Sequence, residues 1–385
     1  MLATEVIFWL SVALLIYVYV GYPALMYLVA RVFPRPVYTG EDFPLVTVLI
    51  AAHNEQDCIE ATVRNKLTQD YPAEKLDVVV VSDGSIDATD QRVVELCKAY
   101  PSRVHLIRQE PRAGKTSALN LAMPTLKGEI VVFSDANSMY AQDAVRQLVR
   151  RFADPAIGYV TGKMVYATDG DNATGDGCSA YMRYENVLRD LESKVGSVVG
   201  VDGGIDVIRK HLYTPMRADQ LPDFVQPLHV VTQGYRVVYE AGALLREPAL
   251  SSGADEYRMR VRVSLRALWA LWDMRHLFNI FRYGFFSIQL ASHKLLRYAV
   301  FLFLIAAAVT NVVLVNEGVI YQLALAVQVA FYTLAWWGHG RSRRGIRSRI
   351  GYIPYYFMLL NLASAQAFGK FMLGKKQTVW KPRTG

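Results

Sequence analysis

Short apolar runs that end on an aspartate dominate the first half of the chain. Residues 77–83, DVVVVSD, carry four consecutive valines, and residues 128–135, GEIVVFSD, repeat the pattern. A short run without polar alternation is typical of a central parallel strand, because both of its faces are covered. Ligands bind beyond the carboxyl ends of such strands in open α/β sheets. We therefore expect Asp83 and Asp135 at the edge of the sheet that holds a ligand.

Helical segments alternate with these strands. Apolar strands are predicted around VTVLIAAHN, LDVVVVSD, VHLIRQ and EIVVFSD, with helices near 55–69, 87–100 and 115–126. This alternation predicts a doubly wound, mostly parallel α/β sheet with right-handed crossovers. The second half of the domain is less regular. It contains a loop rich in glycine and aspartate at 168–177 and a predicted helix from about Cys178 to Lys194.

A long uncharged segment precedes this domain. Residues 6–30 contain no charged side chain, and a membrane-spanning helix needs about 20 such residues. A cleaved signal peptide would have a basic start and a small-residue cleavage site, whereas this start carries only Glu5 and the apolar run is too long. We expect an uncleaved anchor. Arg31 and Arg35 follow it and place its carboxyl end in the cytoplasm by the positive-inside rule.

The composition shifts after Gly253. Residues 255–298 mix arginine with Trp, Phe, Leu and Tyr, which suits helices lying in the membrane interface. Two apolar segments of spanning length follow, at 299–315 and 319–337. A further apolar segment at 350–372 lies between an arginine-rich loop and a basic tail, both expected in the cytoplasm. A single crossing cannot satisfy both, so a re-entrant or interfacial placement stays open.

The charge of +8 and the 52% hydrophobic content fit a membrane protein. Because the arginines border apolar segments, membrane lipids rather than nucleic acid are the expected partners. Three widely spaced cysteines and scattered histidines do not indicate a zinc site or a disulfide framework, and the apolar spans lack the ionisable residues of a transporter. The expected regions are an anchor (1–33), an α/β domain (45–253), interface helices (255–298), two spans (299–338), and a basic loop, apolar segment and basic tail (339–385).

Five motifs resemble, in their order and spacing, those of membrane-bound family 2 glycosyltransferases, a group that includes cellulose, chitin and hyaluronan synthases. They are IAAHNE (50–55), VVSDGSIDAT (80–89), RAGKTSALN (112–120), FSDANS (133–138) and PDF…GYRVVYE (222–240). The resemblance covers about residues 45–300. It implies the GT-A nucleotide-sugar-binding fold and a UDP-sugar donor.

The resemblance also implies which residues hold the donor. Asn54, Glu55 and Asp83 would bind the uridine part, with His53 beside them. Capping of the following helix is the other interpretation of Asn54 and Glu55.

A glycine-lysine-threonine run at 114–116 looks like a phosphate loop. A Walker A motif would need glycine at position 109, which is Gln109 here, so the ATPase interpretation fails on spacing. The resemblance places Lys115 near the donor diphosphate. A solvated lysine at a helix start is the alternative.

Asp135 and Asn137 occupy the position of the family's DxD motif, where Mg²⁺ or Mn²⁺ bridges a carboxylate and the diphosphate. Magnesium is usually bound by one or two carboxylates plus substrate phosphates, and the cation offsets charge on the leaving group. Asn137 departs from the usual aspartate and adds no charge. A turn stabilised by its side chain is the other interpretation.

The family's catalytic base is the last residue of a Thr-Glu-Asp triplet, eleven residues before a glycine. Counting back eleven from Gly234 gives Asp223, with Leu221 and Pro222 at the Thr and Glu positions. As a general base, Asp223 would take the acceptor proton and the reaction would invert the anomeric centre. Asp219 is a second candidate, and capping of a helix over 224–233 is the structural alternative for Asp223.

Two further segments resemble acceptor-side motifs. Residues 200–210 match the glycine-rich stretch of the acceptor site, where Gly203 and Gly204 allow close approach of the backbone, and Asp202 bonds a hydroxyl or forms a turn. Residues 259–263 match the Gln-x-x-Arg-Trp motif only through Arg262, whose guanidinium suits a diphosphate. The missing Trp argues against processive synthesis.

The sequence thus predicts an inverting glycosyltransferase of the bacterial inner membrane with a cytoplasmic catalytic domain. The predicted acceptor is a polyprenyl-diphosphate-linked sugar in exopolysaccharide or cell-envelope assembly. Two alternatives stay open. One is a processive synthase that extends and translocates a growing glycan, as a homo-oligomer or with partners of a polysaccharide assembly system. The other is a nucleotide-sugar-binding membrane scaffold without turnover.

Overall fold

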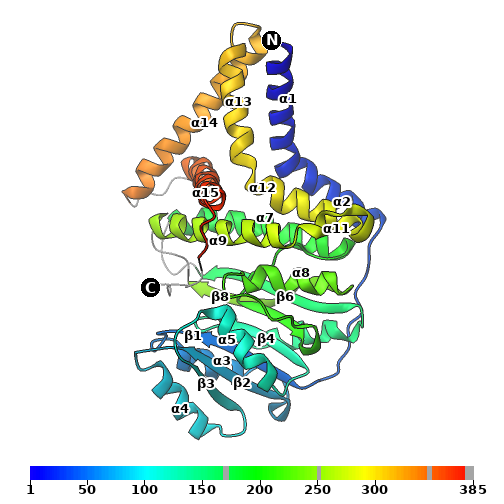
Figure 1. Ribbon diagram of the computed structural model, residues 1–385, viewed down its shortest axis with the longest axis vertical. Helices are drawn as coiled ribbons and strands as arrows, with labels where there is room; N and C mark the ends of the chain where they lie inside the picture. Colours follow the sequence, from blue (N-terminus) through cyan, green and yellow to red (C-terminus); the bar gives the residue numbers. More distant parts are fainter. Residues whose placement is uncertain (168–172, 249–252, 345–348, 378–385) are drawn as a thin grey trace. The chain divides into compact units, whose positions relative to one another are not determined.

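The computed structural model describes residues 1–167, 173–248, 253–344 and 349–377. It contains two compact units (Figure 1). The α/β unit is built from Ala30–Ala167 and Glu185–Pro248, and the helical unit from Met1–Val29, Thr168–Tyr184 and Ala249–Lys376. The first part of the predicted loop at 168–177, and Lys381 and Arg383 of the basic tail, lie outside the described residues.

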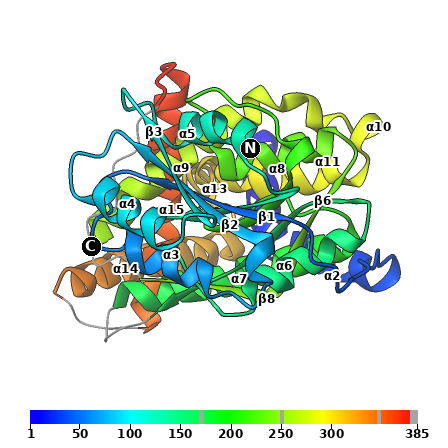
Figure 2. The ribbon, with the colours of Figure 1, turned by 90° about the horizontal axis from the view of Figure 1, so that it is seen from below.

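One mixed sheet forms the core of the α/β unit, and its described strands lie in the order β3-β2-β1-β4-β7-β6-β8-β5. Strands β3, β2, β1 and β4 run parallel side by side (Figure 1 and Figure 2), whereas β7 runs antiparallel to β4 and β6. This confirms the predicted mostly parallel α/β sheet. The strands are β1 (Val46–Ala52), β2 (Leu76–Asp83), β3 (Val104–Gln109), β4 (Ile130–Asp135), β5 (Met139–Tyr140), β6 (Ile157–Ala167), β7 (Ile205–Arg209) and β8 (Arg236–Pro248).

The helices of this unit connect the strands. They are α3 (Ile59–Leu67), α4 (Thr89–Ala99), α5 (Lys115–Ala122), α6 (Ala144–Val149) and α8 (Pro222–Thr232), together with the second half of α7 (Ala173–Val195). The three helices predicted between the first strands are therefore present as α3, α4 and α5. The helix predicted from about Cys178 is longer at its amino end.

Alternate strand residues place several polar groups on one side of the sheet. Successive side chains of a strand point to opposite faces. Val79 and Val81 of β2 and Phe133 of β4 belong to one buried cluster, which also contains Leu119 of α5 and Val230 of α8. Strand residues 83 and 135 continue the same phase, as does residue 206 with respect to Ile208 in β7, another member of the cluster. Three aspartates therefore share the side of the sheet that α5 and α8 cover.

Besides the first half of α7, the helical unit contains α1 (Leu2–Ile16), α2 (Tyr22–Val32), α9 (Gly253–Asp273), α10 (Ile280–Tyr283), α11 (Phe285–Leu290), α12 (Leu296–Tyr298), α13 (Val300–Leu314), α14 (Val319–Arg343) and α15 (Arg349–Met372). Two described helical segments are long and apolar enough to cross a membrane, Leu2–Val32 and Val319–Arg343. Helix α13 was predicted to be a span of its own, but it has only 15 residues. It reaches spanning length only together with the preceding segment Phe285–Tyr298, and the two segments are bent by 58° relative to each other.

Candidate active site

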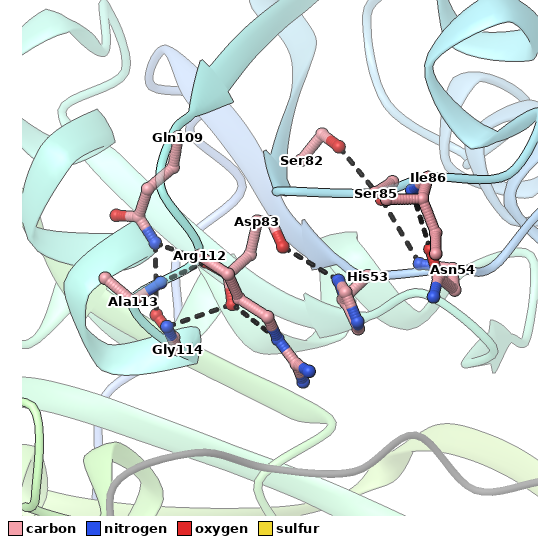
Figure 3. A network of polar contacts seen from close by, with 10 residues as sticks. All are labelled: His53, Asn54, Ser82, Asp83, Ser85, Ile86, Gln109, Arg112, Ala113 and Gly114. Carbon is pink, nitrogen blue, oxygen red and sulfur yellow. Dashed lines mark hydrogen bonds and ion pairs between the residues drawn. The ribbon is translucent and has the colours of Figure 1, made fainter.

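Asp83 is the centre of a hydrogen-bond network at the carboxyl end of β2 (Figure 3). Its side chain is 1% exposed. Asp83 Oδ1 accepts hydrogen bonds from Gln109 Nε2 (2.6 Å) and the Ala113 amide (2.8 Å), and Oδ2 accepts one from the Gly114 amide (2.9 Å). Arg112 Nε lies 3.7 Å from Oδ2. Asp83 therefore holds the loop that leads into α5, and its role as a nucleotide ligand stays a prediction.

His53 and Asn54 tie the end of β1 to the same region (Figure 3). His53 is buried and its Nδ1 lies 2.8 Å from the carbonyl oxygen of Asp83. Asn54 has a φ of 55°, donates its amide to Ser85 Oγ (3.2 Å) and accepts a hydrogen bond from the Ile86 amide (2.9 Å). These two residues shape the turn between two strand ends, where the donor nucleoside is predicted.

The capping interpretation of Asn54 and Glu55 is wrong. Helix α3 begins at Ile59, and its N-cap residue is Cys58. Glu55 instead accepts a hydrogen bond from the Cys58 thiol at Oε2 (3.1 Å), and its main-chain carbonyl accepts the amide of Ile59 (2.9 Å).

Lys115 and Asp135 form an ion pair at the start of α5. Lys115 Nζ lies 2.5 Å from Asp135 Oδ1, and the side chains are 20% and 37% exposed. Burial opposes the charged form of the lysine, but the carboxylates of Asp135, Asp223 and Asp206 outweigh it and raise the pKa of Lys115. The alternative of a solvated lysine is therefore wrong. The pair holds a permanent cation at the strand end where the resemblance expects the diphosphate.

Asp135 and Asn137 carry the type of oxygen donor that divalent cations take in proteins, and binding of a cation by these two residues stays a prediction. Asp135 ends β4, and Asn137 lies in the turn that follows. The Asn137 side chain makes no hydrogen bond to any described residue, so the turn-stabilising interpretation lacks its contact. No group of three or more His, Cys, Asp or Glu side chains that could hold a metal ion occurs in the described parts of the chain. A cation here would complete its shell with phosphate oxygens and water, as Mg²⁺ commonly does.

A buried lysine bonds to the main chain of the turn that follows β4. Lys66 is fully buried and its Nζ donates to the carbonyl oxygen of Ser138 (2.5 Å), while Ser138 Oγ bonds to Glu247 Oε1 (3.0 Å). Burial lowers the pKa of Lys66 well below its usual value, although Asp135 and Glu247 oppose this. The sequence reasoning missed this residue. The sequence does contain a signal for its burial, because Lys66 lies on the same face of α3 as the buried Ile59.

Asp223 faces a small cavity from the first turn of α8. The helix begins at Pro222 with Leu221 as its N-cap, so the capping interpretation of Asp223 is wrong. Gly203, at a φ of 79°, packs against the Asp223 carboxylate: a Cβ on Gly203 would lie 3.0 Å from Asp223 Cβ and closer still to Oδ2. The cavity has a volume of about 10 Å³ and is lined in part by Lys115, Phe133, Tyr159, Gly203, Asp206 and Asp223.

Asp206, which the sequence reasoning also missed, contributes a second carboxyl group to this cavity. It lies in β7 between Phe133 of β4 and Thr161 of β6, and it is 1% exposed. Burial raises the pKa of Asp206 to about 7. A hydrogen bond from Thr161 opposes this shift, and the charge of Asp223 adds to it. The available signal is a lone acidic residue in the otherwise apolar strand IDVI.

Asp202 is committed to another partner. Its Oδ1 lies 2.6 Å from Arg189 Nη1 of α7, and both side chains are buried. Burial raises the pKa of Asp202, although the charge of Arg189 opposes the shift. Its carboxylate therefore joins α7 to the segment before β7, and a bond to a sugar hydroxyl stays a prediction.

The remaining predicted residues occupy different places. Asp219, the second candidate base, is held by Arg217 Nε at 3.1 Å. The carbonyl of Gly204 accepts a hydrogen bond from the Tyr140 hydroxyl (2.8 Å). Arg262 lies on α9 in the helical unit, so its role at the diphosphate stays a prediction.

The sequence of this chain is similar to those of known glycosyltransferases. Residues 47–210 match the family described as Glycosyl transferase family 2. The beta-monoglucosyldiacylglycerol synthase of Trichormus variabilis is 28% identical over 185 residues, which cover 46% of this chain and 39% of that protein. The poly-beta-1,6-N-acetyl-D-glucosamine synthase of Staphylococcus aureus (strain MSSA476) is 26% identical over 235 residues, covering 59% and 56%. The chain thus spans about half the length of the curated relatives it matches.

A solved structure shares the fold over nearly the whole chain. The mannosyltransferase PcManGT from Pyrobaculum calidifontis, in complex with GDP-Man and Mn²⁺, superposes with a TM-score of 0.74. The match covers 97% of this chain and 99% of that one, at 23% sequence identity.

Proposed function

Because the chain carries a glycosyltransferase family 2 domain, we propose that it transfers a sugar from a nucleotide-sugar donor to an acceptor at a membrane. One observation carries this proposal. The Lys115–Asp135 pair stands at the carboxyl end of β4, and Asp223 shares with Lys115 the lining of one small cavity. Such a site provides a positive charge for a leaving diphosphate and a carboxylate for an acceptor hydroxyl.

Different residues act on the donor and on the acceptor. Lys115 binds the diphosphate and stabilises the negative charge that develops as the bond to the sugar breaks. A divalent cation, Mg²⁺ or Mn²⁺, when held by Asp135 and Asn137, would add further charge neutralisation. Asp223 accepts the proton of the acceptor hydroxyl while that oxygen forms a bond to the anomeric carbon from the face opposite the diphosphate. The product is inverted at that carbon, and the nucleoside diphosphate leaves.

The helical unit supports a membrane acceptor. Its two long apolar segments suit a bilayer, and one relative is named for a glycolipid product and another for a polysaccharide. We propose a UDP-sugar as donor and a polyprenyl-diphosphate-linked sugar as acceptor, in the bacterial inner membrane with the α/β unit in the cytoplasm. The Met259 and Val263 that replace Gln and Trp of the processive motif favour a single transfer.

The test is donor turnover by the full chain in membranes that contain polyprenyl-linked lipids. UDP-glucose, UDP-N-acetylglucosamine and GDP-mannose are offered with Mg²⁺ or Mn²⁺ and with a chelator, to wild type, Asp223→Asn and the control Asp154→Asn. Asp154 is a buried aspartate that bonds the Ala156 amide at 2.9 Å.

We expect the wild type to release the nucleoside diphosphate in a metal-dependent reaction and to produce a lipid longer by one sugar. Both products should be lost in Asp223→Asn and kept in Asp154→Asn. A long polymer would favour the processive synthase, and a diacylglycerol product would replace the polyprenyl acceptor. Donor binding without release in any lipid would contradict the proposed transfer and favour a scaffold.

A further inference from the structure

The buried carboxyl group of Asp206 has an incomplete set of partners. In the described structure its Oδ1 is buried and has no hydrogen-bond partner. A buried polar atom without a partner is costly, on the order of 1–3 kcal/mol, and native proteins rarely keep one without a reason. An apolar side chain at this position of β7 would continue the pattern of its neighbours. A buried aspartate at this position therefore indicates a ligand that bonds to its carboxyl group.

The space in front of Asp206 fits one small polar group. The cavity volume of about 10 Å³ corresponds to roughly one water-sized probe. Apolar rings of Phe133 and Tyr213 form part of its wall, and Asp223 and Lys115 supply its other charged groups. A hydroxyl group fits this space because it can donate one hydrogen bond and accept another.

We propose that Asp206 is a positioning residue of the acceptor site, whose carboxyl group hydrogen-bonds one hydroxyl group held beside Asp223. This inference rests on the proposed function and adds a residue to it. The hydroxyl belongs either to the acceptor sugar or to a water molecule that orients it. In its neutral form the carboxyl group donates a hydrogen bond through one oxygen and accepts through the other.

The charges around Asp206 decide when it is neutral. Burial and the neighbouring carboxylates favour the protonated form, and Lys115 favours the ionised one. The titratable and polar groups that act on it come from four elements and one loop: Lys115 of α5, Asp223 of α8, Tyr159 and Thr161 of β6, Tyr140 of β5, and Asp202 before β7. With its pKa raised to about 7, Asp206 loses its proton within the physiological range.

The test compares the pH dependence of transfer in wild type, Asp206→Asn, Asp206→Ala and the control Asp154→Asn, all as full chains in the same membranes. We expect the wild-type kcat/KM for the acceptor to fall as the pH rises through about 7, because ionised Asp206 no longer donates a hydrogen bond. Asparagine keeps a donor and an acceptor but does not titrate, so Asp206→Asn should retain activity at pH 6 and lack the fall. The control should keep the wild-type profile.

Asp206→Ala removes the contact altogether. Its kcat/KM for the acceptor should drop about two- to tenfold at pH 6, the range for one net hydrogen bond, with the KM of the donor unchanged. If only the KM of the acceptor rises, the hydroxyl group that Asp206 bonds belongs to the acceptor. If the rates of sugar transfer and of donor hydrolysis fall equally, this hydroxyl group belongs to water.

The outcomes separate the inference from the function on which it rests. An active wild type whose pH profile survives in Asp206→Asn, or an Asp206→Ala variant with unchanged kinetics, would overturn the role of Asp206 alone. A wild type that transfers no sugar to any acceptor would contradict the proposed function and this inference with it.

Discussion

Three aspartates on one side of the sheet have different environments. Asp83 is surrounded by main-chain and side-chain donors, Asp135 is paired with Lys115, and Asp206 is buried with one oxygen lacking a partner. The same carboxyl group can therefore hold a loop, bind charge or carry a proton, because burial and neighbouring charge decide which form is stable.

Replacing Gly203 with alanine should displace the proposed base. The new Cβ would overlap the Asp223 carboxylate, and a φ of 79° costs an alanine about 1–2 kcal/mol. We expect a loss of kcat of at least about tenfold with little change in donor affinity, measured by turnover and by calorimetric titration of the nucleotide-sugar. The control is Gly196→Ala, where a Cβ meets nothing within 4 Å. Equal activities of the two variants would contradict the contact.

Asp206 should also make stability depend on pH. Its pKa is about 7 in the folded chain against an ordinary value of 3.8, so between these values the unfolded chain has lost a proton that the folded chain keeps. Stability should therefore fall as the pH rises from about 4 to 7 and then level off. The melting temperature of Asp206→Asn, relative to wild type, should rise between pH 5 and pH 8. If the melting temperatures of the two proteins change in parallel with pH across this range, Asp206 is ionised throughout it.

At the scale of elements, the position of α5 depends on contacts outside the helix. The helix has eight residues, too few to be stable alone. Leu119 fixes one of its sides in the core, and the carboxylate of Asp83 fixes its beginning by bonding two successive amides. The placement of Lys115 above β4 follows from this anchoring.

Asp83→Asn should loosen the start of α5. An asparagine has one acceptor oxygen, so the amide of Ala113 or Gly114 would lose its buried partner at a cost of about 1–3 kcal/mol. We expect faster hydrogen exchange in the peptide 108–118 and weaker donor binding. Asp77→Asn, at the other end of β2, is the control and should exchange like wild type. Unchanged exchange in Asp83→Asn would mean that packing alone holds the loop.

At the scale of the whole molecule, the helical unit has a surface unlike that of a water-soluble protein. On α14, Leu323, Val327 and Trp336 are 62%, 69% and 77% exposed. Large exposed apolar areas mark a binding surface or a membrane-facing one, and the length of Val319–Arg343 fits a bilayer.

Charges placed in both long apolar segments should weaken membrane retention. A lysine near the centre of a spanning helix costs about 2.5–3.5 kcal/mol. We expect the double variant Ile16→Lys and Val327→Lys to appear in the soluble fraction after alkaline carbonate extraction, with wild type and the matched double alanine variant staying in the pellet. Full retention of the lysine variant would argue against these two segments as spans.

Much of the fold could be predicted from local patterns. The valine run before Asp83 and the isoleucine-valine run before Asp135 define strands by themselves, because a fully apolar run needs two covered faces. The order of strands and helices around them then restricts the topology to a doubly wound sheet. The apolar segment at 6–30 is equally local, since length and the lack of charge suffice to identify it.

Tertiary structure decided which further side chains share the site. Asp206 reaches the cavity of Asp223 because β7 pairs antiparallel with both β4 and β6, and no local pattern encodes that pairing. The same pairing, together with α7, places Arg189 against Asp202. The sequence determined which elements form, since this depends on neighbours along the chain. The protonation and partners of each carboxyl group depend on neighbours in space, and these exist only once the sheet has formed.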